Sequence, residues 1–225
     1  MTEILYEDRD ILVCVKPAGT LSEASEDIHS LPKMIEKECA DRGSPTSLFA
    51  VHRLDREVSG VMVYAKNKKA AAKLSALVAE RKFHKEYLAV VEGSPEKDSD
   101  TLTDLLFRDS RKNKTYAVDR KRAGVKEASL EYTTLEHGEN TTLVKIILHT
   151  GRTHQIRVQF ASRGHSVLGD RKYGSKTKAL GIALCSHKIE FAHPSSGKIV
   201  SFSYIPRDEA LWGEYSTLLK NGADG

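Results

Sequence analysis

The sequence predicts an α+β protein built on a mixed, mainly antiparallel sheet. Short runs of alternating or branched apolar residues outnumber the helical segments. Several of these runs stand next to one another in the chain and are joined by turn residues, as the strands of a hairpin are. The sequence contains no internal repeat and no low-complexity tract, so a single fold with flanking helices is expected.

The first part of the chain is expected to form four strands and two helices. Ile11–Lys16 is an apolar run that ends at Pro17-Ala18-Gly19, a turn signal. Asn67 is expected to cap a helix that continues to about Arg81, with its apolar residues on one face. The other expected elements are strands at Ile4–Tyr6, Gly60–Lys66 and Tyr87–Glu92 and a helix at Leu31–Cys39.

The second part begins with a polar stretch, residues 94–126, which we expect to form loops and short strands. Alternation at Ala128, Leu130 and Tyr132 and the branched run Leu143–His149 predict an antiparallel pair around a turn near Gly138. The remaining expected elements are a helix at His154–Arg163 stopped by Gly164, a hairpin of Ile189–Ala192 with Ile199–Tyr204, and a final amphipathic helix at Asp208–Leu219.

Size and composition indicate an ordinary globular protein. The 225 residues suit one large domain or two small lobes, and 40% hydrophobic with 29% charged residues is a usual soluble mixture. No apolar run is long enough to cross a bilayer, and the start of the chain does not resemble a signal peptide. The three cysteines are scattered, which favours reduced thiols in a cytoplasm.

The charge is unevenly distributed along the chain. Residues 1–50 hold five Lys/Arg and ten Asp/Glu, whereas residues 51–90 hold nine against four and residues 108–126 hold eight against two. Two basic stretches beside an acidic one are typical of a protein that binds a polyanion on one side. Lysines on the solvated surface of helices would explain either stretch taken alone.

The first unusual motif is V-H-R-L-D-R-E-V-S-G, residues 51–60. Asp55 stands between two arginines in a loop ahead of a strand, and such neighbours keep a carboxylate ionised. An ionised carboxylate held in place can act as a nucleophile or a base. A structural salt bridge that fixes the turn is the alternative interpretation.

The second motif is T-G-R-T-H-Q-I-R, residues 150–157, at a strand-to-helix turn. Thr153 could cap the helix, whose N-terminus would favour a phosphate group. Arg157, in the first turns, could be held rigidly enough for bidentate pairing. An ordinary exposed arginine on an amphipathic helix is the alternative.

The third motif is K-F-H-K-E-Y-L-A-V-V-E-G, residues 82–93, a strand that follows a basic helix end. Tyr87 on this strand could stack on a flat base while its hydroxyl makes a hydrogen bond. A tyrosine that simply packs within a sheet is the alternative.

These three motifs, in this order, resemble the RluA-type family of RNA pseudouridine synthases. The family pattern H-R-L-D-x-x-T/S-S-G appears here as H-R-L-D-R-E-V-S-G, and K-x-Y-L-A-x-V-x-G and G-R-T/S-H-Q-I/L-R-V follow at residues 85–93 and 151–158. Flanking signatures are V-K-P-A-G (15–19), G-H-S-V-L-G-D-R-K-Y-G (164–174) and F-A-H-P-S-S-G-K (191–198). The resemblance extends from about Ile4 to Pro206.

The resemblance implies an isomerase that converts uridine to pseudouridine in structured RNA, tRNA or rRNA, with no cofactor and no metal. Asp55 would attack the base or the ribose C1′, Arg157 would pair with Asp55, and Tyr87 would stack on the flipped uracil. Arg53 would fill the gap that the base leaves. Further RNA contacts are expected from His52, Lys85, Arg152, Thr153 and His154.

The resemblance also implies the organisation of the protein. Residues 1–225 are expected to form a single catalytic domain, two lobes around a central active-site cleft, without the separate S4-type RNA-binding domain that many members carry. We expect a monomer in the cytoplasm, with no membrane partner. The sequence departs from the family pattern at Val58, Gln159 and Cys185, and the changes at Gln159 and Cys185 could alter packing or RNA contacts.

The sequence fits other functions less well. A metal hydrolase would need paired ligands such as H-E-x-x-H, which the scattered histidines do not provide. An aspartate-nucleophile hydrolase of another fold would need a D-x-D loop near the N-terminus. An RNA-binding protein of the same fold that has lost catalysis is the main alternative, although Asp55, Tyr87 and Arg157 are all present.

Overall fold

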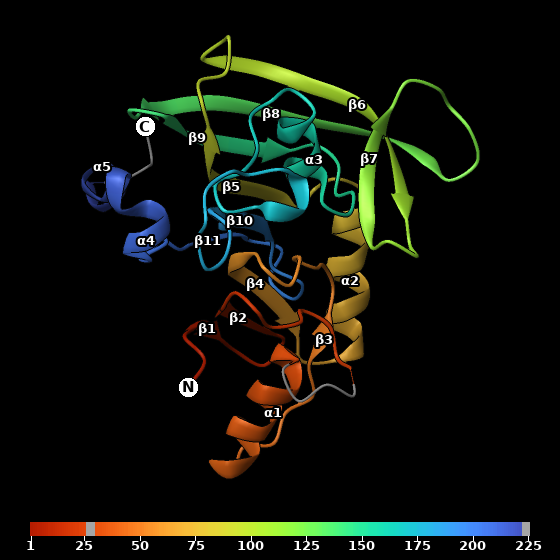
Figure 1. Ribbon diagram of the computed structural model, residues 1–225. Helices are drawn as coiled ribbons and strands as arrows, with labels where there is room; N and C mark the ends of the chain where they lie inside the picture. The colour runs from red at the N-terminus through yellow and green to blue at the C-terminus, as the bar shows by residue number, and fades with distance from the viewer. Residues whose placement is uncertain (26–29, 222–225) are drawn as a thin grey trace. The chain divides into compact units, whose positions relative to one another are not determined.

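The structure, a computed structural model, describes residues 1–25 and 30–221. The chain divides into two compact units. Unit 1 comprises residues 1–85 and 185–204, and unit 2 comprises residues 86–184 and 205–225. Each unit contains its own strands, its own helices and its own buried apolar residues (Figure 1).

Unit 1 holds strands in the order β1-β2-β4-β10, with β11 beside β10 and β3 beside β4. The β4–β10 pair is parallel, and the other pairs are antiparallel. The predicted hairpin near the C-terminal end is confirmed, with Ala192 opposite Ile199. The strands are β1 (Ile4–Glu7), β2 (Ile11–Lys16), β3 (Phe49–Ala50), β4 (Ser59–Ala65), β10 (Leu184–Ala192) and β11 (Ile199–Ser203).

In the part of unit 1 that the structure describes, both helices, α1 (Leu31–Asp41) and α2 (Lys68–Ala79), were predicted. The Asn67 side chain accepts the Ala70 N–H at 2.9 Å, so the predicted cap is confirmed. Ala70 and Leu74 pack α2 against the buried side chains of β2, β4 and β10. The apolar face of α2 therefore covers one side of this sheet.

Unit 2 holds strands in the order β5-β9-β8-β6-β7, and these neighbours form antiparallel pairs. The predicted pair around Gly138 is confirmed, and the Gly138 N–H donates to the Thr141 carbonyl at 2.9 Å. The strands are β5 (His84–Glu92), β6 (Ser99–Asp109), β7 (Lys114–Val118), β8 (Val125–His137) and β9 (Thr141–Leu148). With one parallel pair in unit 1, the predicted α+β class with a mixed, mainly antiparallel sheet is confirmed.

The expectation of loops and short strands at residues 94–126 was right for the loops and the five-residue strand β7, and wrong for the long strand β6. This stretch contains the eleven-residue strand β6 and the strand β7, and β8 begins within it. Leu102 and Leu106 of β6 are buried, while most side chains between them are polar. Pairing of β6 with both β7 and β8 stabilises a strand whose own apolar pattern is weak.

A short helix, α3 (Gln155–Ala161), and the 3-10 turn η1 (Arg171–Tyr173) lie over β8 and β6 of unit 2 (Figure 1). Val158 of α3 and Tyr173 of η1 pack against Leu106 and Ala128 of these strands. The predicted helix was three residues too long: it ends at Ala161, and the Gly164 N–H donates to the Ala161 carbonyl at 3.1 Å. Packing on the sheet, not helix length, stabilises this element.

The predicted helix over Asp208–Leu219 is broken. The structure has α4 (Glu209–Trp212), the 3-10 turn η2 (Gly213–Tyr215) and α5 (Ser216–Asn221) in its place. Glycine is a poor helix former, and the Tyr215 hydroxyl bonds to Thr141 Oγ1 at 2.7 Å, which draws the middle of the segment toward β9. Among the described residues, no helix is both long and apolar enough to traverse a bilayer.

Candidate active site

Asp55 lies in unit 1, in the loop between β3 and β4. The Val58 N–H donates to the Asp55 carbonyl at 3.1 Å, which closes a tight turn. Arg56 and Glu57 at the tip of the turn are exposed, whereas Asp55 itself is half-buried. The turn thus presents a partly shielded carboxylate at its first residue.

The backbone is held on both sides of Asp55. Ser22 Oγ donates to the Leu54 carbonyl at 2.9 Å and accepts the Leu54 N–H at 3.3 Å. On the other side, Lys16 Nζ donates to the Arg56 carbonyl at 3.0 Å. These bonds anchor the residue before Asp55 and the residue after it, and so they limit the movement of the turn.

Lys16 is a buried cation that ties this turn to residues 17–20. Its ammonium also donates to the carbonyls of Pro17 at 3.0 Å and Thr20 at 2.9 Å, so all three of its N–H groups have acceptors. Burial lowers the pKa of Lys16 to about 8, and the nearby carboxylates of Glu57 and Asp55 oppose that shift. Lys16 is therefore a central anchor of the Asp55 turn.

His52, predicted to contact RNA, lies in the core of unit 1. Its Nε2 accepts the Val63 N–H of β4 at 3.2 Å, and its ring lies 5.1 Å from that of Phe83. Burial, together with the Lys85 ammonium, lowers the pKa of His52 to about 3, so the ring is neutral. The side chain is only 8% exposed. This geometry favours a role in holding the loop to β4 over direct contact with RNA.

Arg53 and Lys85 differ in accessibility. Arg53 is exposed and forms a surface ion pair with Glu23 at 3.2 Å. The Lys85 ammonium lies 5.9 Å from the centre of the Phe83 ring, and burial lowers the pKa of Lys85. Of these two predicted RNA contacts, Arg53 is the one whose side chain is accessible in its own unit.

Tyr87 lies in β5 of unit 2, opposite Ile146 of β9. Its side chain is 6% exposed, and its neighbours Leu88 and Ala89 are fully buried. The tyrosine is therefore fixed by the sheet, and its ring has a defined orientation.

The turn before α3 is organised by Gln155, not by Thr153. Gln155 Oε1 accepts the Arg152 N–H at 3.0 Å and the Thr150 hydroxyl at 2.7 Å, and Gln155 Nε2 donates to the Ser129 carbonyl at 3.0 Å. The predicted Thr153 cap was wrong, because His154 occupies the N-cap position and makes no side-chain cap bond. The seven-residue helix begins with buried residues, which does not favour the predicted phosphate site at its N-terminus.

Arg157 is buried in α3 and makes the bidentate pair that the sequence favoured, with a carboxylate of its own unit. Its Nε donates to Asp170 Oδ2 at 2.6 Å and its Nη2 donates to Asp170 Oδ1 at 2.9 Å. The guanidinium also lies 5.2 Å from the centre of the Tyr173 ring. Both partners belong to the G-H-S-V-L-G-D-R-K-Y-G segment.

The predicted RNA contacts next to Arg157 are engaged within unit 2. His154 Nδ1 bonds to the Tyr173 hydroxyl at 2.8 Å and is buried. The Thr153 carbonyl accepts from the Thr115 hydroxyl at 2.9 Å, and Arg152 Nε donates to the Glu127 carbonyl at 2.9 Å. These interactions favour structural roles for the three residues.

The three departures from the family pattern lie at buried positions. Val58 is 2% exposed. Gln159 Nε2 donates to Asp104 Oδ2 at 2.7 Å, and burial raises the pKa of the Cys185 thiol to about 12. The sequence left open whether these changes alter packing or RNA contacts, and their burial favours an effect on packing.

Four residues of this arrangement were not predicted: Lys16, Ser22, Asp170 and Tyr173. Lys16, Asp170 and Tyr173 lie within the flanking signatures, so the signal was present without a role attached to it. Ser22 lies outside every motif, and no pattern in the sequence marks it.

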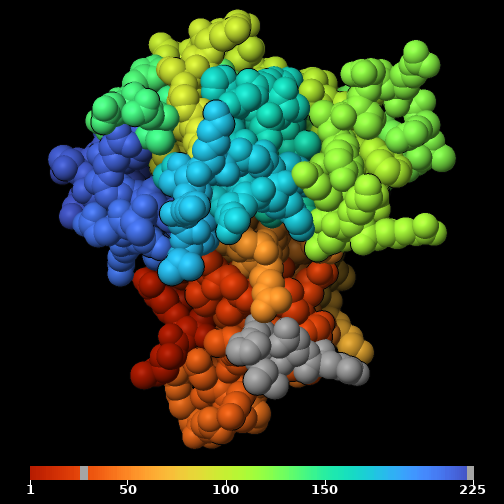
Figure 2. Space-filling view, viewed as in Figure 1, coloured from red at the N-terminus to blue at the C-terminus, as the bar shows by residue number. Residues whose placement is uncertain are grey.

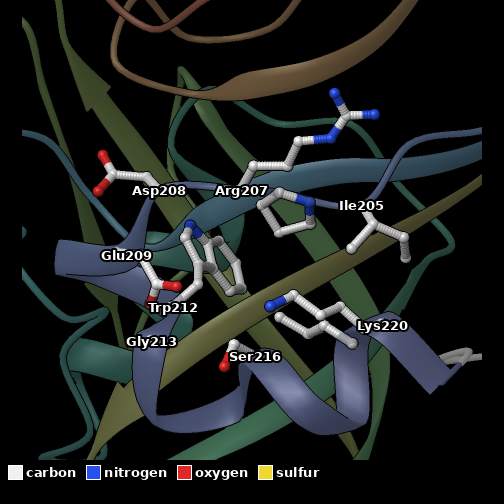
Figure 3. Close-up of a pocket in the computed structure, with 10 residues that line it drawn as sticks. Ile205, Arg207, Asp208, Glu209, Trp212, Gly213, Ser216 and Lys220 are labelled. Atoms are coloured by element: carbon white, nitrogen blue, oxygen red, sulfur yellow. The ribbon is translucent and has the colours of Figure 1, made fainter.

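A pocket of about 460 Å³ lies at the C-terminal segment of unit 2 (Figure 3). Trp212 and Lys220 line it, and so do Arg207 and Asp208 on the connecting segment ahead of α4. It contains none of the predicted site residues.

Comparison with known proteins shows which class this fold and these motifs define. Residues 10–162 match the family model described as RNA pseudouridylate synthase, which is about two thirds of the chain. The chain belongs to this family of RNA-modifying isomerases. Within it, the chain is an RluA-type enzyme, an RNA pseudouridine synthase.

Individual relatives agree with this assignment. The chain is 38% identical over 96% of its length, and 72% of the relative's, to an uncharacterized RNA pseudouridine synthase of Aquifex aeolicus. It is 34% identical over 93% of its length, and 71% of the relative's, to the ribosomal large subunit pseudouridine synthase D of Zymomonas mobilis. The solved structure of human RNA pseudouridylate synthase domain containing 1 superposes with a TM-score of 0.77 at 25% identity, covering 96% of this chain and 87% of that one.

Proposed function

We propose that this enzyme converts specific uridines to pseudouridine in structured ribosomal or transfer RNA, with Asp55 as the nucleophile. The observation that carries the proposal is the H-R-L-D turn, in which a half-buried carboxylate stands between two backbone positions held by Ser22 and Lys16. A carboxylate fixed in this way, next to an exposed Arg53, suits attack on a nucleotide that has been drawn out of its RNA.

The reaction is an isomerisation, so all atoms of the substrate are retained. Asp55 attacks the uracil base or the ribose C1′, and the glycosidic C1′–N1 bond breaks. The uracil turns within the site and rejoins C1′ through C5, while the bond between Asp55 and the substrate breaks and frees the carboxylate. The proton on C5 is then lost, and N1 gains one. No oxidant, reductant or group donor is needed, and water must be excluded because it would trap C1′.

Two further residues support this chemistry. Arg157 would pair with Asp55 and keep it ionised and aimed. The ring of Tyr87 would stack on the flipped uracil, and its hydroxyl would assist loss of the C5 proton. Both side chains are held firmly in unit 2, by Asp170 and by the sheet.

RNA binding would depend on the basic residues of both units. Arg53 is exposed and would fill the space that the flipped base leaves. The segment 108–126, with eight Lys/Arg and two Asp/Glu, stands out from the surface of its unit as the yellow-green part of the chain at the right of Figure 2. Such a segment suits the phosphate backbone of a folded RNA.

The names of relatives favour ribosomal RNA over transfer RNA. Three of them, from Zymomonas mobilis, Buchnera aphidicola and Vibrio cholerae, are named for the large ribosomal subunit. We propose that the enzyme acts as a monomer in the cytoplasm.

The test is a pseudouridine map of total RNA from a strain lacking this protein, complemented with wild type or with Asp55→Asn. We expect one or a few sites to disappear and to return only with wild type. Sites that return equally with Asp55→Asn would contradict the role of Asp55. If no site depends on the protein, the alternative of an RNA-binding protein without catalysis gains support, and purified protein with transcribed rRNA and tRNA fragments would then test it.

A further inference from the structure

Asp170 and Tyr173, which have no role in the proposed reaction so far, hold the guanidinium of Arg157. Asp170 takes the Nε–Nη2 edge through two bonds of 2.6 and 2.9 Å. Tyr173 lies against the guanidinium with its ring centre 5.2 Å away. A planar group held both at an edge and over a face cannot rotate about its own axis without breaking one of these contacts.

The ion pair of Arg157 with Asp170 is buried, so its geometry is set by the protein and not by solvent. The side chains of Arg157 and Asp170 are 3% and 1% exposed. A guanidinium has five N–H donors, and the pair with Asp170 uses two of them. The other three donors lie on the Nη side, so the pair with Asp170 determines the direction in which they point.

The loop that carries Asp170 is itself rigid. Gly169 has φ +81°, and a Cβ at this position would meet the Gly181 carbonyl oxygen. The Asp170 carbonyl accepts the N–H groups of Tyr173 and Ser175, both at 3.1 Å. The carboxylate is therefore delivered to Arg157 by a closed turn that only glycine at position 169 allows.

Tyr173 connects this pair to the start of α3. Its hydroxyl accepts the Thr115 N–H at 2.9 Å and bonds to His154 Nδ1 at 2.8 Å. His154 has a left-handed backbone (φ 54°, ψ 24°), a conformation that costs energy in a residue other than glycine. The bond to Tyr173 stabilises that conformation three residues ahead of Arg157.

We infer that Asp170 is a positioning residue of the pseudouridine synthase reaction, which acts by holding the Arg157 guanidinium in the orientation that Asp55 requires, with Tyr173 fixing its plane. The inference rests on the proposed function, because it concerns the same site. Loss of the Asp170 charge would leave a buried cation that is held through one acceptor in place of two, and the guanidinium would then turn away from its working orientation.

The test is Asp170→Asn, compared with Asp104→Asn as a matched control. Asp104 also binds an arginine of unit 2 with both oxygens, since Arg163 Nη1 and Nη2 donate to it at 2.9 and 3.2 Å, but it does not contact Arg157. We expect Asp170→Asn to lower the single-turnover rate about 10²-fold while the Kd for RNA changes less than about threefold. We expect Asp104→Asn to change the rate less than about threefold.

A double-variant cycle separates positioning from a general loss of structure. In an Arg157→Lys background, Asp170→Asn should cost little further rate, because the group that Asp170 orients has been removed. A full additional loss in that background would overturn the inference, as would a wild-type rate for Asp170→Asn alone. If Asp170→Asn does not fold, Asp170→Glu keeps the buried anion one methylene away, and an unchanged rate in that variant would overturn the inference equally.

The outcomes also distinguish this inference from the proposed function. If wild-type protein forms no pseudouridine in any RNA, the proposed function fails and the inference fails with it. If wild type is active, Arg157→Lys is impaired and Asp170→Asn is not, the proposed function stands and only the positioning role of Asp170 is lost.

Discussion

Asp55 in unit 1 and Arg157 in unit 2 are fixed in different ways. Around Asp55, the protein holds the backbone: Ser22 and Lys16 bind the peptide groups of its neighbours, while its own side chain is half-buried. Around Arg157, the protein holds the side chain: Asp170 binds the guanidinium edge and Tyr173 lies against its face.

This difference fits the chemistry proposed for each residue. A nucleophile has to approach the substrate and form a bond, so a fixed loop with a side chain that retains some freedom suits it. The Arg157 guanidinium is proposed to orient a carboxylate and forms no covalent bond, so a rigid guanidinium suits this role. The variants below test this comparison, from the largest expected effect to the smallest.

Arg157→Lys should have the largest effect outside the nucleophile. A lysine ammonium is a point charge and cannot reproduce the bidentate edge that Asp170 binds. We expect the single-turnover rate of pseudouridine formation to fall about 10³-fold with a small change in RNA affinity. A rate within tenfold of wild type would show that side-chain rigidity at this position is not needed.

Tyr87→Phe keeps the ring and removes the hydroxyl. We expect a loss of about 10²-fold in rate, in the range of a lost proton-transfer group, with RNA affinity unchanged. The rate should be measured together with RNA binding. Full activity would contradict a role for the hydroxyl and would leave the stacking role intact.

Lys16→Met tests the backbone anchoring of the Asp55 turn. It removes three hydrogen bonds to carbonyls, and we expect a loss of about 2–4 kcal/mol in the free energy of unfolding and about tenfold in rate. Lys66→Met is the matched control, because Lys66 also bonds to a carboxylate and a carbonyl of unit 1 but lies away from the turn. Equal effects of the two variants on the rate would contradict the anchoring role of Lys16.

His52→Gln tests the neutral histidine under the same loop. Its expected effect is on how the free energy of unfolding depends on pH below 6.5. The pKa of His52 is lowered from 6.5 to about 3, so the unfolded chain binds a proton that the folded protein does not. Stability is therefore lost as the pH falls from 6.5 toward 3, by about 5 kcal/mol in total.

Glutamine keeps an acceptor for the Val63 N–H but does not titrate. The urea-unfolding free energy of His52→Gln should thus depend less on pH in this window than that of wild type. Identical pH profiles would show that His52 is not a buried neutral ring in the folded protein.

Much of the fold was predictable because its elements have local signals. Asn67 marks the start of α2, and the branched run of β9 and the turn at Gly138 mark a hairpin. The strand β6 was missed because its stability comes from pairing with β7 and β8, which lie later in the chain. The tail was misjudged because contacts of Tyr215 with Thr141 override a local helical pattern.

In the candidate site, too, the residues with local sequence signals were predicted and those that depend on distant contacts were not. Asp55, Tyr87 and Arg157 lie in motifs, and the motifs pointed to them. Asp170 became visible only when the structure brought it to Arg157, thirteen residues away in sequence. The sequence shows that His52 and His154 each stand in a charged motif, but not that both rings are buried. Their burial depends on distant residues such as Phe83 and Tyr173.

The most direct test of the central claim uses purified wild type and Asp55→Asn with transcribed ribosomal and transfer RNA fragments labelled with tritium at C5 of uridine. Tritium release reports formation of the new C–C bond, and binding of the same RNAs is measured in parallel. We predict that wild type releases tritium from at least one RNA, and that Asp55→Asn binds that RNA within about threefold of wild type but releases none. Release by Asp55→Asn at a rate near that of wild type would contradict the claim that Asp55 is the nucleophile.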